Sequence, residues 1–166
     1  MKTTAFFTRI LRWLTGSRLS VDNSVVRELD LDRFLGSWYE VARFDHFFER
    51  GMSQTKANYV LRDDGNIDVI NTGIKNGKPK TAKGLAKQTD IPALLRVSFF
   101  GPFYSDYRVM LVDADYRYML IGSGSDGYLW ILSRTPQLAD CDRAAILSEA
   151  KHRGYDTDKL IWVKQS

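Results

Sequence analysis

Residues 36–44, GSWYEVARF, mark the point at which the chain takes up the alternating pattern of a β-strand. Seven more short segments of this kind follow, separated by turn-forming residues such as Asp63-Asp64-Gly65-Asn66 and Gly124-Ser125-Asp126-Gly127. Short strands at regular spacing with turn signals between them are typical of an antiparallel sandwich or barrel. Because successive strands are expected to pair with each other, the order favours an up-and-down barrel.

The expected fold class is all-β: an eight-stranded antiparallel up-and-down β-barrel with a short N-terminal helix and a C-terminal α-helix packed on its outside. The helices are predicted at residues 31–35, with Asp30 as N-cap, and at residues 140–153, before Gly154. The strands are predicted at residues 37–44, 55–61, 67–74, 80–88, 94–100, 107–112, 117–123 and 128–133, with a last short strand at 160–163. We expect three parts: an amphipathic segment at residues 1–20, a linker at 21–30 and the barrel domain at 31–166.

The charge of the chain is unevenly distributed. Its 24 Lys and Arg residues exceed its 20 Asp and Glu residues by four. That excess equals the charge of Lys2, Arg9, Arg12 and Arg18 in the first twenty residues, where there is no acid. The rest of the chain is therefore neutral, which argues against a nucleic-acid partner. A single cysteine, Cys141, excludes an internal disulfide, and two distant histidines do not make a metal site.

The N-terminal segment, MKTTAFFTRILRWLTGSRLS, has the pattern of a basic amphipathic helix. Its apolar residues share one arc of a helix and its basic residues occupy the rest. Such a helix suits a membrane surface that carries anionic lipids, so we expect peripheral membrane contact through residues 1–20. Two alternatives stay open: a helix docked on the protein's own surface, and a degenerate signal peptide. The residues on the apolar arc are Trp13, Phe6, Ile10, Leu14, Phe7 and Leu11.

Small residues recur on the face of the strands that is predicted to point into the barrel. Ala42, Ala57, Ala82, Gly84 and Ala86 leave room that a tightly packed core would fill. An apolar void of this kind can hold an apolar guest. The alternative is that Phe99, Tyr59 and Trp130 fill the space. The expected ligand-binding residues are Ala42, Ala57, Tyr59, Val69, Asn71, Ala86, Val97, Phe99, Tyr107, Val109, Ile121 and Trp130.

Three motifs resemble those of the lipocalin family. Gly36-Ser37-Trp38 resembles the Gly-x-Trp motif at the start of the first strand. Asp113-Ala-Asp-Tyr116 resembles the second motif, with Ala114 in the place of its threonine, and Arg134 matches the third. The resemblance covers roughly residues 31–163 and is closest to the bacterial lipocalins, which are related to apolipoprotein D.

The resemblance implies structural roles for Gly36, Trp38, Asp113, Tyr116 and Arg134. Trp38 is expected at the closed end of the barrel with the Arg134 guanidinium across its ring. Glu40 is expected to face inward near that end, where a buried carboxylate must find a hydrogen-bond donor or take up a proton. A structural hydrogen bond is the favoured role of Glu40, and general-acid catalysis is the alternative.

The loops at the opposite end of the barrel, which we call its mouth, carry aromatic residues and cations. An apolar cup with a basic rim suits an amphiphile with a long chain and an anionic head. We therefore expect a lipid-binding protein that holds fatty acids or (lyso)phospholipids, for storage or transport, although the basic loop is also compatible with an ordinary solvated turn. The residues are Phe47, Phe48, Phe100, Phe103 and Tyr104, with Arg50, Lys75, Lys78 and Lys80.

No catalytic constellation is visible, so we do not expect an enzyme, and no cofactor is expected. Two alternatives remain: an enzyme with the lipocalin fold, favoured if Glu40 or His46 has a strongly shifted pKa, and a structural or partner-binding barrel with a filled interior. The resemblance implies a bacterial envelope location, at the outer membrane. No cysteine near the N-terminus offers a lipoprotein anchor, which leaves a soluble periplasmic or cytoplasmic location open. A homodimer is also left open.

Overall fold

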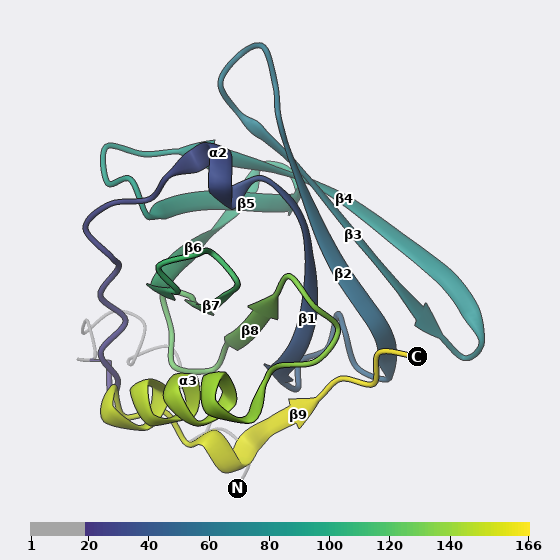
Figure 1. Cartoon of the computed structure of the whole chain (residues 1–166). Coiled ribbons are helices and arrows are strands. Elements are labelled where there is room, and N and C mark those ends of the chain that lie inside the picture. Colours follow the sequence, from purple (N-terminus) through teal and green to yellow (C-terminus); the bar gives the residue numbers. More distant parts are fainter. Residues whose placement is uncertain (1–18) are drawn as a thin grey trace, which may run out of the picture.

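The computed structural model describes residues 19–166, which form a closed antiparallel barrel (Figure 1). The barrel closes because β1 pairs with both β2 and β8, while the other strands pair in sequence order. The all-β, eight-stranded barrel predicted from the sequence is thereby confirmed. The strands are β1 (Gly36–Phe44), β2 (Met52–Leu61), β3 (Ile67–Lys75), β4 (Lys78–Gln88), β5 (Leu94–Phe100), β6 (Phe103–Val112), β7 (Tyr118–Gly122) and β8 (Leu129–Ser133).

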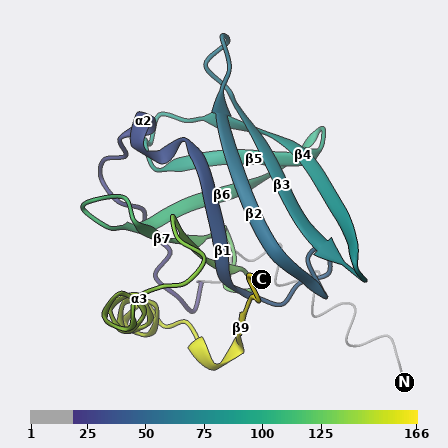
Figure 2. The ribbon, with the colours of Figure 1, turned by 45° about the vertical axis from the view of Figure 1, so that its right-hand side comes forward.

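Strands β3 and β4 form the longest hairpin and project beyond their neighbours (Figure 2). Asn76 and Gly77 connect them, both with positive φ, as a tight two-residue hairpin turn requires. Their pairing begins at Lys75 and Lys78, directly beside the turn. The hairpin tip therefore stands at the mouth, the end at which β1 finishes.

The opposite end is closed by α2 (Leu31–Phe34) and the side chains that surround it. Asp30 caps the helix by accepting a hydrogen bond from the Arg33 backbone N–H, as predicted. Phe34 is fully buried, and its carbonyl accepts a 2.7 Å hydrogen bond from the Trp38 indole N–H. The short helix is thus a plug whose aromatic residue lies inside the barrel.

Arg134 links this plug to the barrel wall. Its guanidinium carbon lies 3.7 Å from the centre of the Trp38 ring. The same guanidinium donates to the backbone carbonyls of Ser37, at 2.7 Å, and Leu35, at 2.9 Å. Gly36 sits between them with φ of +91°, and a Cβ there would lie 3.5 Å from the guanidinium. The stacked pair predicted for Trp38 and Arg134 is present.

The turn between β6 and β7 supports α2 from the other side. Asp113 accepts hydrogen bonds from the backbone N–H of Asp115 and from the side chain of Arg117, which hold its pKa below the usual range despite the opposing effect of burial. Tyr116 has positive φ, and its hydroxyl accepts a 2.7 Å hydrogen bond from the Asp30 backbone N–H. The second motif therefore anchors the start of the plug.

A second apolar core lies outside the barrel, beneath α3 (Asp140–His152). Ile146 and Ala150 of this helix pack on outward-facing residues such as Leu120 and Ile131. The chain then passes through η1 (Thr157–Lys159) into β9 (Leu160–Trp162), which pairs with the last residues of β1. The C-terminal helix therefore packs on the outside of the barrel, as predicted (Figure 1).

The residues after β9 fill a seam between β1 and β2. The register of β2 on β1 ends at Tyr39, and β9 takes over the free edge of β1 from Ala42 to Phe44. The Gln165 side-chain amide donates to the carbonyls of Glu40, at 2.7 Å, and Thr55, at 3.0 Å. The chain beyond the helix is thus part of the barrel wall.

Residues 19–30 run as an extended segment along the barrel from α3 to α2 (Figure 1). Val25, Val26 and Leu29 pack on the inner core cluster, and the Val26 N–H donates to the Val109 carbonyl. The segment predicted as a linker therefore contacts the barrel along its length. The amphipathic helix predicted for residues 1–20 lies outside the described residues, except for Leu19 and Ser20.

Replacing Arg134 tests the link between plug and wall. We expect Arg134→Ala to lower the free energy of unfolding by about 2–4 kcal/mol, because it removes a cation–π contact and charged hydrogen bonds together. The free energy of unfolding of Arg134→Lys should lie between those of the wild type and Arg134→Ala, since an ammonium cannot both stack on the Trp38 ring and reach both carbonyls. Urea unfolding is the measurement. Arg62→Ala, at an exposed arginine of the same end, is the control; an equal effect of the two alanine variants would refute the linking role.

Candidate functional site: the barrel interior

The inner core cluster shows which side chains face the barrel interior. Most of the residues predicted to line it are found there, together with Phe34 and Leu95. Several of these side chains are only partly buried although they face inward, including Val97, Phe99 and Trp130. These three side chains therefore keep some contact with solvent although they belong to the inner cluster. The predicted residues in this cluster are Ala57, Tyr59, Val69, Ala86, Val97, Phe99, Tyr107, Val109, Ile121 and Trp130.

Ala42 does not face the interior, and its predicted place there is wrong. The register of β1 on β8 shifts between Glu40 and Ala42, where a β-bulge adds one residue to β1. The bulge reverses the alternation, so that Ala42 belongs to the outer core beneath α3. Arg43, which simple alternation places outside, is turned inward instead.

Asn71 lies between Ala57 and Ala82 in the register of β2, β3 and β4, on the inward-facing side. Its side-chain oxygen is buried and accepts no hydrogen bond from the residues that the structure describes. Ala82, the partner of Asn71 on β4, is exposed. The wall at this level therefore offers one polar atom among small residues.

The void predicted next to Gly84 is occupied. A Cβ built on Gly84 would lie 2.9 Å from the Phe99 ring and 2.8 Å from the Ser98 carbonyl oxygen. The glycine is therefore the residue that lets the Phe99 ring lie flat against β4. This part of the interior follows the alternative in which aromatic side chains take up the space left by small ones.

Two tyrosines form a floor above the plug. The hydroxyls of Tyr59 and Tyr107 lie 2.8 Å apart, and the Tyr59 ring centre is 4.7 Å from that of Phe34. Burial raises the pKa of both phenols, so they remain protonated and hydrogen-bonded to each other. Their rings separate the filled, closed end from the upper half of the barrel.

A buried pair of ionisable side chains, Glu40 and Arg43, lies in the wall of that upper half. The Arg43 guanidinium donates a 2.7 Å hydrogen bond to Oε1 of Glu40, and both side chains are buried. Arg43 also donates to the backbone carbonyls of Glu49, at 2.7 Å, and Met52, at 3.1 Å. The structural role expected for Glu40 is therefore present, and its partner also holds both ends of the loop that leads into β2.

That loop, residues 45–51, is latched to the barrel by Glu49. Its Oε2 lies 2.5 Å from Nε2 of His46 and accepts a 3.1 Å hydrogen bond from the Trp130 indole N–H. Hydrogen bonds from His46 and Trp130 outweigh burial and hold the pKa of Glu49 below its usual range. An ionised carboxylate thus ties the mouth loop to an inward-facing residue of β8.

Glu40 titrates in the opposite direction. Burial, followed by repulsion from the Glu49 carboxylate, raises the pKa of Glu40 to about 8, although the Arg43 guanidinium acts against the shift. Two carboxyl groups at one buried site favour a state in which one is protonated and the other is ionised. The opposite directions of the two pKa shifts favour the proton on Glu40 over the proton on Glu49.

Sequence reasoning did not find Arg43 and Glu49. Arg43 stands three residues after Glu40, a spacing that puts two residues of a regular strand on opposite faces. Glu49 lies in a loop, where alternation predicts nothing. Arg43 comes to the same face as Glu40 only because of the bulge between Glu40 and Ala42. The sequence around the bulge contains no glycine or proline that would mark its position.

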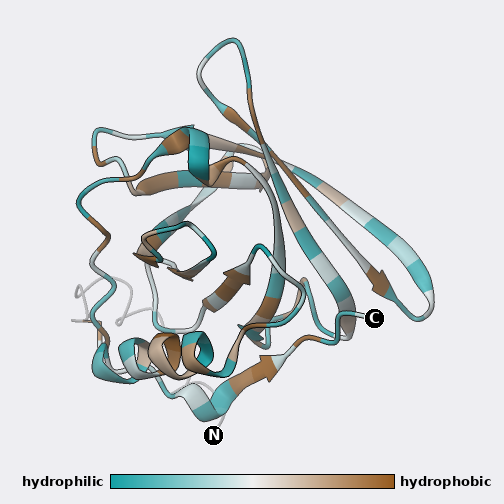
Figure 3. Ribbon diagram, in the orientation of Figure 1, coloured by the Kyte–Doolittle hydropathy of each residue, from teal (hydrophilic) through white to brown (hydrophobic). Residues whose placement is uncertain are grey.

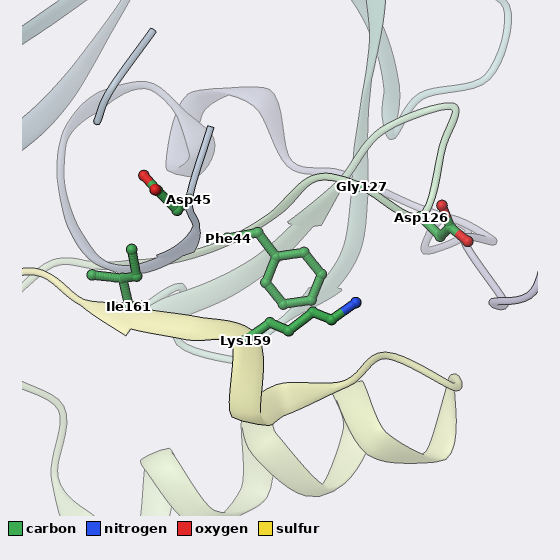
Figure 4. Close-up of a pocket in the computed structure, with 6 residues that line it drawn as sticks. All are labelled: Phe44, Asp45, Asp126, Gly127, Lys159 and Ile161. Atoms are coloured by element: carbon green, nitrogen blue, oxygen red, sulfur yellow. The ribbon is translucent and has the colours of Figure 1, made fainter. Parts of the chain in front are cut away.

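A separate hollow of about 380 Å³ lies outside the barrel, between the end of β1 and β9 (Figure 4). Phe44 and Ile161 form its apolar part, while Asp45, Asp126 and Lys159 are charged. None of the expected ligand-binding residues lines it. Within residues 19–166 no group of His, Cys, Asp and Glu is placed to hold a metal ion, and no helix has the length and hydropathy needed to cross a membrane.

A closed eight-stranded barrel with a plugged end, a stacked Trp–Arg pair and an apolar interior defines a lipocalin. The sequence family described as "Lipocalin-like domain" matches residues 29–165, and the chain belongs to this family. The resemblance to the lipocalin family, seen in three motifs, is confirmed, and its closer form, to the bacterial lipocalins, agrees with the relatives described next.

The chain is 47% identical over 146 residues to the outer membrane lipoprotein Blc of Escherichia coli K12, covering 86% of this chain and 82% of that protein. It is 42% identical over 170 residues to the Blc of Vibrio cholerae, covering 97% and 98%. Mouse apolipoprotein D is more distant, at 31% over 153 residues, covering 86% and 80%. Among solved structures, insecticyanin of the tobacco hornworm matches with a TM-score of 0.70 at 22% identity, covering 86% and 84%, which supports the fold.

Replacing Glu40 tests its buried proton. A raised pKa in the folded state means that the protonated form stabilises the fold below pH 4.5 and that this stability is lost as the pH rises to about 8. We expect Glu40→Gln, which cannot lose a proton, to reduce that fall by up to a few kcal/mol. Urea unfolding at several pH values is the measurement.

Asp90→Asn, at an exposed carboxylate in the loop before β5, is the control and should keep the wild-type pH profile. If Glu40→Gln also follows the wild-type profile between pH 5 and pH 8, the proton does not reside on Glu40.

Proposed function

We propose that this lipocalin holds the acyl chain of a fatty acid or lysophospholipid in the upper half of its barrel. The observation that carries the proposal is the set of inward-facing apolar side chains that remain partly exposed there, Val97, Phe99 and Trp130. Burial of each methylene group contributes about 0.8 kcal/mol, so an acyl chain against this wall needs no specific contact to bind. Tyr59 and Tyr107 set the depth that such a chain can reach.

The polar groups around the upper half suit the head of an amphiphile. Asn71 offers a side-chain oxygen without a partner among the described residues, and Lys78 and Lys80 stand exposed near the hairpin tip. An anionic head near these lysines leaves the chain to enter the apolar interior. The ligand-contact roles of the inward-facing residues are part of this proposal.

The place proposed for this activity is the cell envelope. Relatives at 42–49% identity carry the name outer membrane lipoprotein. The basic amphipathic segment at residues 1–20 supports contact with a membrane surface. Storage and transport of the lipid are both compatible with this location.

One observation favours a second function, an enzyme. Glu40 is a buried carboxylic acid with a pKa of about 8, the property that sequence reasoning set as a condition for catalysis. Its Oε1 is engaged by Arg43, and binding therefore remains the better supported function. Lipid recovered unchanged after long incubation supports binding; hydrolysis that is lost in Glu40→Gln supports the enzyme.

Native mass spectrometry of the protein purified from cells, followed by lipid extraction, is the direct test. Recovery of a fatty acid or lysophospholipid supports the proposal. A barrel that carries no lipid and takes up none of either class when they are added contradicts it.

A blocking variant locates the site. Val97 lies opposite the small residue Ala86, so Val97→Trp is expected to place its ring in the interior and to weaken fatty-acid binding at least tenfold. Isothermal titration calorimetry is the measurement. Val60→Trp, on the exposed face of β2, is the matched control and should bind as the wild type does. Equal affinities of the two variants would place the ligand elsewhere; Val97→Phe repeats the test if the larger ring prevents folding.

A further inference from the structure

Four phenylalanines at the mouth of the barrel stand exposed to solvent. Phe47 and Phe48, in the loop after β1, are 80% and 62% exposed. Phe100 and Phe103, where β5 turns into β6, are 67% and 78% exposed. Phenylalanine is among the residues most often found inside proteins, so four of them at one end of a barrel need an explanation. We call these four side chains the phenylalanine rim.

The rim is assembled by the fold. The ring centres of Phe47 and Phe48 are 5.7 Å apart, and Phe48 lies 6.1 Å from Phe100 across the mouth. Phe100 and Phe103 are paired in the register of β5 and β6. Single exposed apolar residues are ordinary on protein surfaces, but contiguous exposed patches mark interaction sites.

Three lysines stand at the same end of the barrel. Lys75, Lys78 and Lys80 occupy the tip of the β3–β4 hairpin, at register positions that continue the inward-facing rows of Asn71 and Ala82. Figure 3 shows the hydrophilic colouring of this tip beside the more apolar barrel. Within residues 19–166 none of the three forms an ion pair, whereas Arg50 of the first mouth loop pairs with Asp45. The hairpin therefore presents uncompensated positive charge next to the mouth.

The closed end carries charge of the opposite sign. Four guanidiniums there, those of Arg33, Arg62, Arg117 and Arg134, stand among seven carboxylates. The barrel thus has an acidic closed end and a cationic hairpin at its mouth. A negatively charged surface attracts the mouth and repels the closed end, which orients the molecule before contact. The carboxylates belong to Asp30, Asp32, Asp63, Asp64, Asp90, Asp113 and Asp115.

We propose that the mouth of the barrel docks on the surface of a lipid bilayer that carries anionic headgroups. The phenylalanine rim enters the boundary between headgroups and acyl chains, and Lys75, Lys78 and Lys80 contact the headgroups. Exposed aromatic rings flanked by cations are the side-chain set that such a boundary accommodates. The proposal concerns the described part of the chain and is separate from the contact proposed for residues 1–20.

A second copy of the chain fits this surface less well. In a symmetric dimer formed through the mouth, the same patch of each chain faces its counterpart. The lysines of the hairpin tip would then approach those of the partner, and their like charges repel each other. A bilayer with anionic lipids offers both an apolar interior for the rings and negative charge for the lysines.

Docking by the mouth also bears on the proposed function. If the barrel holds an acyl chain, a mouth set on the bilayer lets an amphiphile move between membrane and protein without crossing water. This consequence rests on the proposed lipid binding, but the docking itself does not. Vesicle binding measures the docking and calorimetry with a free fatty acid measures the lumen, so the two proposals fail independently.

Vesicle flotation with the full chain tests the docking. The vesicles contain phosphatidylethanolamine with phosphatidylglycerol, and the comparison vesicles contain phosphatidylcholine alone. We expect Phe47→Ser/Phe103→Ser to bind the anionic vesicles at least tenfold more weakly than the wild type. Val60→Ser/Ile91→Ser, which removes two exposed apolar residues at the closed end, is the matched control and should bind within twofold of the wild type. Residues 1–20 are present in every variant, so their contribution is common to all.

A triple variant tests the charge. Lys75→Gln/Lys78→Gln/Lys80→Gln should weaken binding to anionic vesicles at least tenfold and leave binding to phosphatidylcholine unchanged, because each lysine near an anionic surface contributes roughly a fivefold gain in affinity. High salt should reduce the difference between this variant and the wild type. Equal loss on both vesicle types would contradict the charge contribution.

A local probe reports which end of the barrel meets the lipid. Cys141 is the chain's only cysteine, so Cys141→Ser with Phe103→Cys gives a single site for an environment-sensitive fluorophore. We expect a blue shift and a rise in emission when anionic vesicles are added, and no change for the same label at Ile91→Cys. Vesicle binding without a change at position 103, or no vesicle binding at all, overturns the proposal. So does a rim variant that converts a dimer to a monomer without weakening vesicle binding, which would assign the rim to a second copy.

Discussion

Glu40 and Arg43, two ionisable side chains joined by a 2.7 Å hydrogen bond, lie inside the barrel because β1 contains a bulge between them. The Arg43 guanidinium could not be buried without hydrogen-bond acceptors, since an unpaired ion in such surroundings costs several kcal/mol. The pair is completed by the first mouth loop: Arg43 holds the Glu49 and Met52 carbonyls, and the Glu49 carboxylate reaches His46 and Trp130. Hydrogen bonds to charged groups therefore connect β1, the first mouth loop and the inward-facing Trp130 of β8.

The same bulge divides the apolar residues between two cores. Before it, Trp38 contributes to the interior and packs with Phe34 and Arg134 at the closed end. After it, Ala42 and Phe44 contribute to the outer core that α3 covers. Because of this one inserted residue, β1 contributes side chains first to the inner core at the closed end and then to the outer core beneath α3.

The fold could be predicted from the sequence because alternation, turn residues and the Asp30 cap are local properties. The strands extend beyond the predicted limits at the mouth, where Met52 of β2 and Lys78 of β4 both pair with Lys75 of β3. The interior was predicted less completely, since alternation holds only until a bulge interrupts it. Ala42 and Arg43 exchanged places for this reason, and the Glu49 latch joins residues 81 positions apart in the sequence.

The seam between β1 and β2 has a consequence for the order of events during synthesis. All eight barrel strands have been made once Ser133 has emerged, yet the register of β1 on β2 ends at Tyr39, and β9 and Gln165 bridge the two strands beyond that point. A growing chain that has completed its eighth strand therefore still has an open edge beside Glu40 and Thr55. Unpaired strand edges are sites of misassembly in partly folded chains. The residues after Ser133 therefore complete the barrel wall, and an incomplete chain that lacks them presents an unpaired edge at this seam.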